Sequence, residues 1–336
     1  MAASLDALTR VPSPAPAGEP QRNRRLGVVA IVVSAATMGL AGLLGRLATP
    51  SGAVIGEALT LGRMLVGAVG VLAILAVSRR FHLLRRTRLS WSVVLGGVFL
   101  GLSLATYLSS TVLTDLGRAV ALHYLGPVVA TVLARVLLQE RVSRAETISL
   151  ATSFVGMMLA AGLVGSSPLP GSQDQLAGDA LAALSGVLYG AALLCYRYRG
   201  DMPADVRSFW NFVFGSLGAA GMVALTRPDL SGMTATHWLW AAVFFLVCGL
   251  LALGLLVVAG KHLRAIELSA MSFVEVVVAT LLGAAVYGEA LSVLAVAGIV
   301  LILLAAVVPL LPARGGAAGR RRSERRALRL EASPTR

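Results

Sequence analysis

Two ionisable residues lie deep inside long apolar segments of this sequence, where a charge is costly. Arg63 lies within the apolar segment 53–78, and Glu275 lies within the segment 265–287. If both segments are membrane helices, a rise of about 1.5 Å per residue places both side chains near the middle of the bilayer. An ionisable group at that depth costs about 2.5–3.5 kcal/mol on insertion scales, so a functional role is considered first.

Arg63 carries a planar guanidinium group, which can bind both oxygens of a carboxylate at once. It is therefore a candidate for binding a substrate carboxylate. The alternative is a structural ion pair with a carboxylate on another helix, and both interpretations stay open. Glu57 is a poor partner within the same helix, because a separation of six residues turns the two side chains about 240° apart.

Glu275 carries a carboxyl group that can gain and lose a proton when it is removed from water. The sequence makes it a candidate proton-coupling residue or a ligand for a substrate amine. The alternative is a buried polar anchor between helices. Ser272 lies one helical turn away on the same face, and it is a further candidate for contact with a substrate.

The remaining candidates are side chains that can line a cavity. His123 can titrate near neutral pH, although packing between helices is the more economical interpretation. Pro127, four residues later, removes the hydrogen bond to the His123 carbonyl and can bend the helix. Tyr107, Tyr124 and Tyr189 are candidates because ligand pockets favour aromatic side chains, although ordinary packing explains each of them singly.

The elements that must position these residues are membrane helices. Of the 336 residues, 57% are hydrophobic and 13% are charged, whereas a soluble domain carries about 25% charged residues. Gly97 and Gly101 have the spacing of small residues that allows close helix packing. We predict an all-α integral membrane protein with ten transmembrane helices, at residues 26–47, 53–78, 91–110, 117–138, 145–164, 177–196, 206–225, 237–258, 265–287 and 291–311.

The basic residues predict how these helices are oriented. If the N-terminus is cytoplasmic, 24 of the 29 Lys and Arg residues lie in cytoplasmic segments and three lie in outer loops. The positive-inside rule then predicts a multi-pass protein of the cytoplasmic membrane with both termini in the cytoplasm. Residues 1–25 are predicted to be a disordered basic tail. Residues 312–336 form a second basic tail, whose arginines can bind anionic lipid headgroups.

The fourth and ninth predicted helices repeat one pattern at an offset of 149 residues. Residues 123–140 read HYLGPVVATVLARVLLQE, and residues 272–289 read SFVEVVVATLLGAAVYGE. Because each repeat has five helices, an odd number, the second repeat must enter the membrane in the opposite orientation. Inverted repeats are typical of secondary transporters, whose substrate site lies near the midplane between them. We predict the two repeats at residues 26–164 and 177–311.

These residues resemble the drug/metabolite transporter superfamily, specifically its EamA-like family of two five-helix repeats. The matching features are Pro127 with Glu140-Arg141, Glu275 with Gly288-Glu289, Gly178-Asp179 and Arg63. The stretch GRAVALHYLGP at residues 117–127 further resembles amino-acid exporters of the threonine/homoserine type. The resemblance implies export of amino acids or other small metabolites.

Two positions depart from the pattern of that family. Val276 stands where the ninth helix usually has a proline, which puts a helix break or hinge there in doubt. The second repeat has no clear counterpart of Arg63, and Asn211 is its nearest polar residue. Of the remaining acidic residues, Asp179 is expected to cap the sixth helix, and Glu289 is expected to set topology or to pair with a base.

Other classes of function have less support in the sequence. A membrane-embedded enzyme would need clustered acid–base or metal-binding residues, but the chain has four histidines and no HExxH motif. No GxxxxGK(S/T) motif for direct use of ATP is present. A channel or a non-transport membrane protein stays open. We expect no cofactor, no metal site and no nucleic acid; the expected partners are a small-molecule substrate and membrane lipids, with a homodimer left open.

Overall fold

The computed structural model describes residues 23–137, 144–160, 162, 172–197, 202–263 and 271–307. Every regular element within these ranges is a helix, in agreement with the all-α fold class. The predicted disordered tail up to residue 22 and the basic tail from residue 312 lie outside the described residues.

Helices follow one another along both repeats with short connections. In the first repeat they are α1 (Arg24–Gly39), α2 (Ala41–Leu47), α3 (Gly56–Val77), α4 (His82–Arg86), α5 (Trp91–Ser110), α6 (Leu116–His123), α7 (Gly126–Leu137) and α8 (Arg144–Ala160). In the second repeat they are α9 (Gln173–Arg197), α10 (Ala204–Thr226), α11 (Ala235–Phe244), the π-helical η1 (Phe245–Leu251), α12 (Ala252–His262), α14 (Val274–Tyr287) and α15 (Val293–Val307).

Many of these helices have the length and composition of membrane spans. Val69 is 68% exposed and Val293 is 86% exposed, as expected where a surface contacts lipid instead of water. In the described chain, seven helical segments are long and apolar enough to cross a bilayer: Arg24–Leu47, Gly56–Val77, Trp91–Ser110, Leu116–Leu137, Gln173–Cys195, Asp205–Thr226 and Ala235–Leu256. The chain is therefore a multi-pass membrane protein, and the count of ten spans stays a prediction.

Two of the predicted membrane helices are interrupted at equivalent positions of the repeat. α6 ends at His123 and α7 begins at Gly126, with a turn at Tyr124 between them. Pro127 explains this break, because its ring nitrogen cannot donate a hydrogen bond to the His123 carbonyl. In the second repeat Phe273 forms the turn before α14, and Phe273 lies 149 residues after Tyr124.

The turn at Phe273 settles the doubt raised by Val276, because the helix is interrupted without a proline. The Val276 amide donates to the Phe273 carbonyl at 3.0 Å. This bond spans three residues instead of four, as in the tighter 3₁₀ turn that often begins an α-helix. The turn leaves Glu275 in the first turn of α14.

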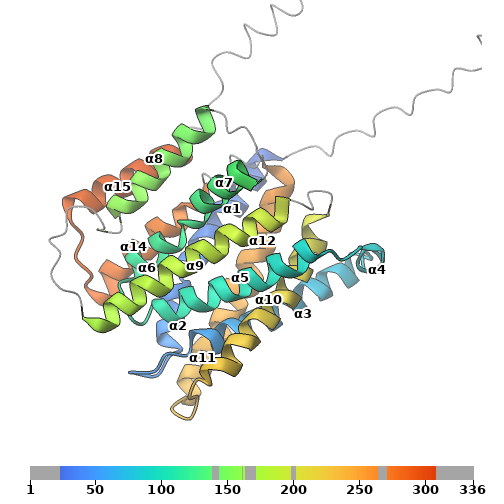
Figure 1. Cartoon of the computed structure of the whole chain (residues 1–336), viewed down its shortest axis with the longest axis horizontal. Coiled ribbons are helices and arrows are strands. Elements are labelled where there is room, and N and C mark those ends of the chain that lie inside the picture. Colours follow the sequence, from blue (N-terminus) through green and yellow to red (C-terminus); the bar gives the residue numbers. More distant parts are fainter. Residues whose placement is uncertain are drawn as a thin grey trace, which may run out of the picture.

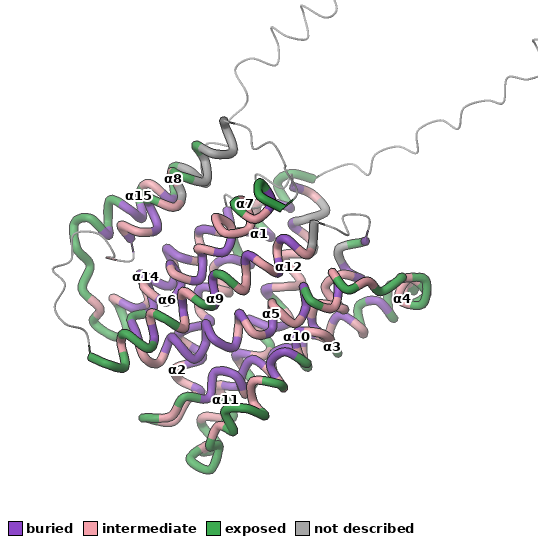
Figure 2. The backbone as a smooth tube through the Cα atoms, in the orientation of Figure 1, coloured by how far each residue is buried: buried purple, intermediate pink, exposed green. Residues whose placement is uncertain are grey.

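The two repeats pack extensively against each other (Figure 1). α5 packs against α9 and α10, α3 against α10 and η1, α1 against α12 and α14, and α6 against α9 and α14. α8 and α15 form a pair at one side of the bundle (Figure 1). Buried residues accordingly concentrate where helices of the two repeats meet (Figure 2).

The contact between α5 and α10 depends on glycines, as the spacing of Gly97 and Gly101 predicts. A Cβ atom on Gly101 would lie 2.7 Å from the Cα atom of Gly215. A Cβ atom on Gly218 would lie 2.6 Å from the carbonyl oxygen of Val98. The two backbones can approach this closely only because no side chain lies between them.

Gly101→Ala is expected to destabilise the protein by about 1–3 kcal/mol, because the added methyl group must push α5 and α10 apart. The matched control is Gly221→Ala, in α10, where an added Cβ atom meets nothing within 4 Å. The midpoint of thermal unfolding in detergent measures both variants. Equal midpoints for the two variants would contradict this account of the crossing.

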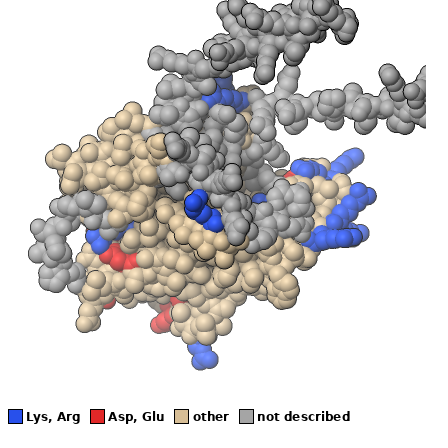
Figure 3. Space-filling view, turned by 45° about the horizontal axis from the view of Figure 1, so that its top comes forward, with Lys and Arg blue, Asp and Glu red and all other residues tan. Residues whose placement is uncertain are grey.

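The two ends of the bundle differ in their charges. We call the end of the bundle at which α2 finishes and α3 begins the α2 end. The opposite end, at which α3 finishes and α4 begins, is the α4 end. Basic side chains gather at the α4 end (Figure 3), where Arg79, Arg85 and Arg86 are exposed. The α2 end carries both acidic and basic side chains, among them Arg46 and Glu289.

Candidate binding site

The structure brings the predicted site residues together from both repeats. Arg63 lies within electrostatic range of Glu275 and of Tyr107. The other four residues join them through ring contacts and hydrogen bonds. The first repeat supplies Arg63 from α3, Tyr107 from α5, His123 from α6 and Tyr124 from the turn after α6. The second repeat supplies Tyr189 from α9, Ser272 from the residues before α14 and Glu275 from α14.

Arg63 is buried without a full set of hydrogen-bond acceptors. Its side chain is 3% exposed, and its guanidinium carbon lies 5.6 Å from the centre of the Phe244 ring. One terminal nitrogen lies 3.1 Å from the Met38 sulfur, which is a weak acceptor, and Nε has no partner. Among the described residues no carboxylate forms an ion pair with it. The structural ion pair considered as an alternative is therefore not observed in this part of the chain.

Room for Arg63 comes from features that the sequence pattern did not reveal. A Cβ atom on Gly249, in η1, would lie 3.2 Å from Cγ of Arg63, so only glycine lets the side chain pass without displacement. The π-helical turn of η1 also places Phe244 and Gly249 on the side of the helix that faces α3. π-helical turns occur mostly as short insertions, frequently at functional sites.

Glu275 is held by a neighbour from the other repeat. The Tyr124 hydroxyl lies 2.8 Å from Oε2 of Glu275 and 3.2 Å from the backbone carbonyl oxygen of Ser272. The first turn of α14 adds backbone N–H groups and the positive end of the helix dipole, which favour a carboxylate at this position. Glu275 is thus held in place, and among the described residues no cation is in direct contact with it.

His123 lies between two tyrosine rings. The centre of its ring is 4.8 Å from that of Tyr107 and 4.9 Å from that of Tyr189, which is stacked on it with an interplanar angle of 17°. Its Nδ1 atom is 3.0 Å from the Ser185 hydroxyl, and that hydroxyl donates to the Ala182 carbonyl at 2.6 Å. Because Ser185 has a single proton, we infer that His123 donates from Nδ1 and that Nε2 is an acceptor.

A second polar cluster lies at the α2 end and joins the repeats. Arg46 forms an ion pair with Glu289 at 3.2 Å and donates to the carbonyls of Thr111 at 2.5 Å and Thr114 at 2.7 Å. Its guanidinium carbon also lies 4.4 Å from the centre of the Tyr287 ring. The base expected to pair with Glu289 is therefore Arg46, whereas Glu140, its counterpart in the first repeat, lies outside the described residues.

Asp179 belongs to the same end and does not cap its helix. α9 begins earlier, at Gln173, and the Ser172 hydroxyl accepts a hydrogen bond from the Gln175 amide at 3.2 Å. Asp179 instead forms an ion pair with Arg118 and accepts a hydrogen bond from the Thr114 hydroxyl at 2.7 Å. The expectation of a cap is wrong because the predicted helix started four residues too late at residue 177.

α6 and α14 run side by side and touch at three levels between the candidate site and the α2 end. At the α2 end, the Leu116 amide donates to Oε1 of Glu289 at 3.0 Å, just beyond α14. At the next residue of α6, a Cβ atom on Gly117 would lie 3.2 Å from the Thr280 hydroxyl. At the candidate site, Tyr124 donates to Glu275. These contacts, called the α6–α14 seam below, lie between the site and the α2 end.

Two repeats of membrane helices that meet at a polar, aromatic candidate site are the arrangement expected of a membrane transporter. The profile of the EamA-like transporter family matches residues 25–162 and again residues 176–311. The chain therefore belongs to the EamA-like transporter family of the drug/metabolite transporter superfamily, which comprises transporters rather than enzymes. The resemblance to this family is confirmed, and the finer resemblance to threonine/homoserine exporters stays a prediction.

The fold is also found among solved structures. One crystal structure, described only as that of a protein, shares 20% sequence identity with the chain at a TM-score of 0.64. The alignment covers 85% of this chain and 96% of the solved chain. At this identity the likeness shows the fold alone. None of the curated proteins compared with the chain matches it.

Proposed function

We propose that this protein is a secondary transporter that exports amino acids or related zwitterions across the cytoplasmic membrane by alternating access. The observation that supports this most is the guanidinium group of Arg63, which is 3% exposed, lacks an acceptor at Nε and lies near Glu275. Buried charges are normally paired. A buried cation that no described carboxylate pairs with fits a site whose anionic partner arrives with the substrate.

The geometry supports one orientation of such a substrate. Its carboxylate accepts hydrogen bonds from Arg63, whose fork of donors matches the two oxygens. Its ammonium group binds Glu275 and takes the place of the Tyr124 hydroxyl, which now lies 2.8 Å from that carboxyl group. The stacked rings of His123 and Tyr189 then form a wall for the substrate side chain. Ser272 is proposed to contact the substrate beside Glu275.

The proposed topology has ten spans and both termini in the cytoplasm. The exposed arginines of the α4 end make that end cytoplasmic under the positive-inside rule, and the α2 end then faces outwards. The same basic segments, together with the basic tails, are proposed to contact anionic lipid headgroups. Export therefore means movement from the α4 end to the α2 end.

Alternating access requires a gate on each side of the site. The α6–α14 seam, reinforced by the ion pair of Arg46 with Glu289, is the proposed outer gate. At the α4 end, the ion pair between Arg80 and Asp205 joins α10 to the segment after α3 and is the proposed inner contact. The turns at Tyr124 and Phe273 are the proposed hinges, because helical hydrogen bonds are already interrupted there.

Glu289→Gln is expected to open the outer gate more often, because the ion pair with Arg46 and the charge that holds α6 are both lost. Thr280→Cys, placed in the seam after Cys195 and Cys248 have been replaced by alanine, reports this opening. Its rate of labelling by a membrane-impermeant thiol reagent, added from outside, is expected to rise several-fold, since losing about 1 kcal/mol shifts an equilibrium about fivefold. Glu289→Asp, which keeps the charge, is the control, and equal labelling rates in all three proteins would contradict the gate.

The direct test of the proposed function is counterflow in proteoliposomes with a labelled panel of amino acids, sugars and nucleotide precursors. Each compound is tested with and without a pH gradient. Saturable counterflow confined to zwitterions supports the proposal. Conductance without saturation indicates a channel, and saturable counterflow of sugars alone indicates a different substrate class; either result would overturn the proposal.

A further inference from the structure

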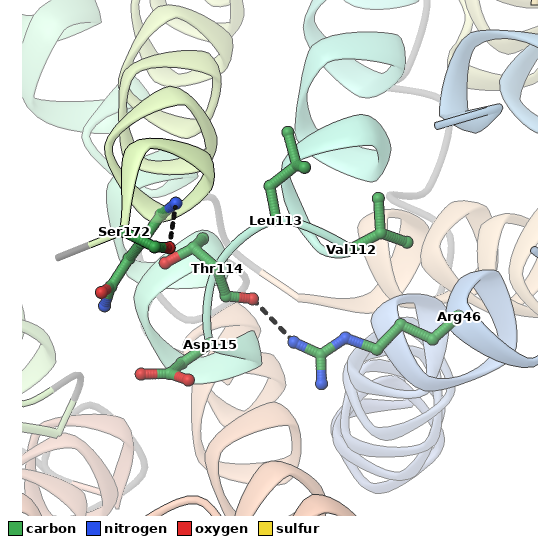
Figure 4. Close-up of a pocket in the computed structure, with 7 residues that line it drawn as sticks. Arg46, Val112, Leu113, Thr114, Asp115 and Ser172 are labelled. Carbon is green, nitrogen blue, oxygen red and sulfur yellow. Dashed lines mark hydrogen bonds between the residues drawn. The ribbon is translucent and has the colours of Figure 1, made fainter. Parts of the chain in front are cut away.

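A cavity opens at the α2 end, directly beside the proposed outer gate. Its volume is about 480 Å³, within the range of cavities that bind small molecules. Most of its lining is polar, and it lies between helices of both repeats (Figure 4). The lining residues are Arg46, Val112, Leu113, Thr114, Asp115, Ser172 and Gln175.

The lining of this cavity includes one basic and one acidic side chain, Arg46 and Asp115. Figure 4 shows Thr114 between the guanidinium group of Arg46 and the carboxylate of Asp115. Asp115 precedes α6 and is exposed, and its side chain makes no capping hydrogen bond to that helix. The side chain of Arg46 is 17% exposed. Solvent therefore reaches both charges without opening the seam.

We propose that this cavity is a second, outward-facing site for the transported zwitterion, called the exit site below. The zwitterion occupies it after leaving the candidate site around Arg63 and Glu275, which is called the central site. The inference rests on the proposed function, because it assumes a substrate with one carboxylate and one ammonium group. The carboxylate binds Arg46 and the ammonium group binds Asp115. The side chains of Ser172 and Gln175 supply further hydrogen-bonding groups at the mouth of the cavity.

Arg46 links this exit site to the outer gate. The same guanidinium group binds Glu289, a gate residue, and the Thr114 carbonyl, which belongs to the cavity wall. A substrate carboxylate at Arg46 competes with Glu289 for one cation. An occupied exit site therefore weakens the gate that the substrate has just passed, and the gate closes again when the substrate diffuses away.

The positions of the two sites fit a path along one helix. Asp115 immediately precedes α6, and His123, at the other end of α6, belongs to the central site. α6 has eight residues, which correspond to about 12 Å. A zwitterion that leaves Arg63 and Glu275 thus meets a second basic and acidic pair, Arg46 and Asp115. The two pairs are separated by about the length of α6.

The test is Asp115→Asn in proteoliposomes that contain the protein in a single orientation. Half-saturation of counterflow is measured separately for substrate added at the outer and at the cytoplasmic side, with the panel amino acid that gives the largest signal. We expect the ratio of the outer to the cytoplasmic constant to rise about three- to tenfold, as for loss of one charge-assisted hydrogen bond in a partly exposed site. Asp229→Asn, an exposed acidic residue in the loop after α10, is the matched control and is expected to leave the ratio unchanged.

The outcomes separate the two proposals. Counterflow of zwitterions with an unchanged ratio in Asp115→Asn would overturn the exit site and leave the proposed function intact. A rise of equal size in Asp229→Asn would also overturn it, because a general surface potential would then explain the effect. Absence of counterflow by any zwitterion in the wild-type protein would overturn the proposed function, and the exit site with it.

Discussion

Glu275→Gln is expected to reduce export of zwitterions about 30-fold or more, because the ammonium group loses its charged partner at a buried site. The variant is also expected to lose the response to a pH gradient, since an amide cannot take up or release a proton. The side chain keeps its size, and its amide oxygen still accepts the hydrogen bond from Tyr124, so the fold should persist. Counterflow and pH-driven efflux in proteoliposomes measure the two effects separately.

Glu57→Gln is the matched control for removing a buried carboxylate. Glu57 is 3% exposed and accepts hydrogen bonds from the hydroxyl groups of Ser109 at 2.8 Å and Thr226 at 2.6 Å. It lies in the first turn of α3, six residues before Arg63. We expect this variant to keep its response to a pH gradient. Normal transport by Glu275→Gln at all pH values, with no change in the effect of the gradient, would rule out Glu275 as the coupling residue.

Residues of the candidate site were found in the sequence because membrane burial makes a polar residue conspicuous. Arg63 and Glu275 each interrupt a long apolar segment, so their depth could be estimated from their position alone. The repeat offset likewise related Tyr124 to Phe273, and both prove to be turn residues. Depth and periodicity are properties of one helix, and a single sequence records them well.

The partners of these residues could not be predicted, because they depend on how separate helices face each other. Nothing in the sequence pairs Arg46 with Glu289, which are 243 residues apart, or places Phe244 beside Arg63. The π-helical turn of η1 changes the face of the helix that meets α3, and it has no counterpart in the pattern of apolar residues. The turn at Phe273 could not be predicted for a related reason, since proline is only one of several ways to interrupt a helix.

Burial of Arg63 lowers the stability of the folded state, and a role in binding the substrate would explain why the residue is retained. A buried cation without a matching anion disfavours the folded state, and the weak contact with Met38 offsets little of that cost. A residue retained only for stability would be paired in the resting protein. Arg63 is thus expected to affect both the stability of the protein and the binding of the substrate. Substitution of Arg63 can separate these two effects.

Arg63→Gln is expected to weaken binding of zwitterions by about 2 kcal/mol or more, or about 25-fold in the half-saturating concentration. Arg63→Lys keeps the charge but loses the planar fork of donors, so we expect an intermediate loss. The sharper readout is selectivity. The wild-type protein is expected to prefer an amino acid over the amine that lacks its carboxylate, and Arg63→Gln is expected to lose this preference, because the group that recognises the carboxylate is gone.

Thermal unfolding distinguishes this role of Arg63 from a structural one. If Arg63 binds the substrate, the midpoint of Arg63→Gln without substrate stays at or above the wild-type value, since a buried unpaired charge has been removed. Added zwitterion then stabilises the wild-type protein but not the variant. A structural anchor predicts the reverse, a lower midpoint and retained stabilisation by substrate. Arg227→Gln, at the exposed end of α10, controls for loss of a positive charge and is expected to change neither quantity.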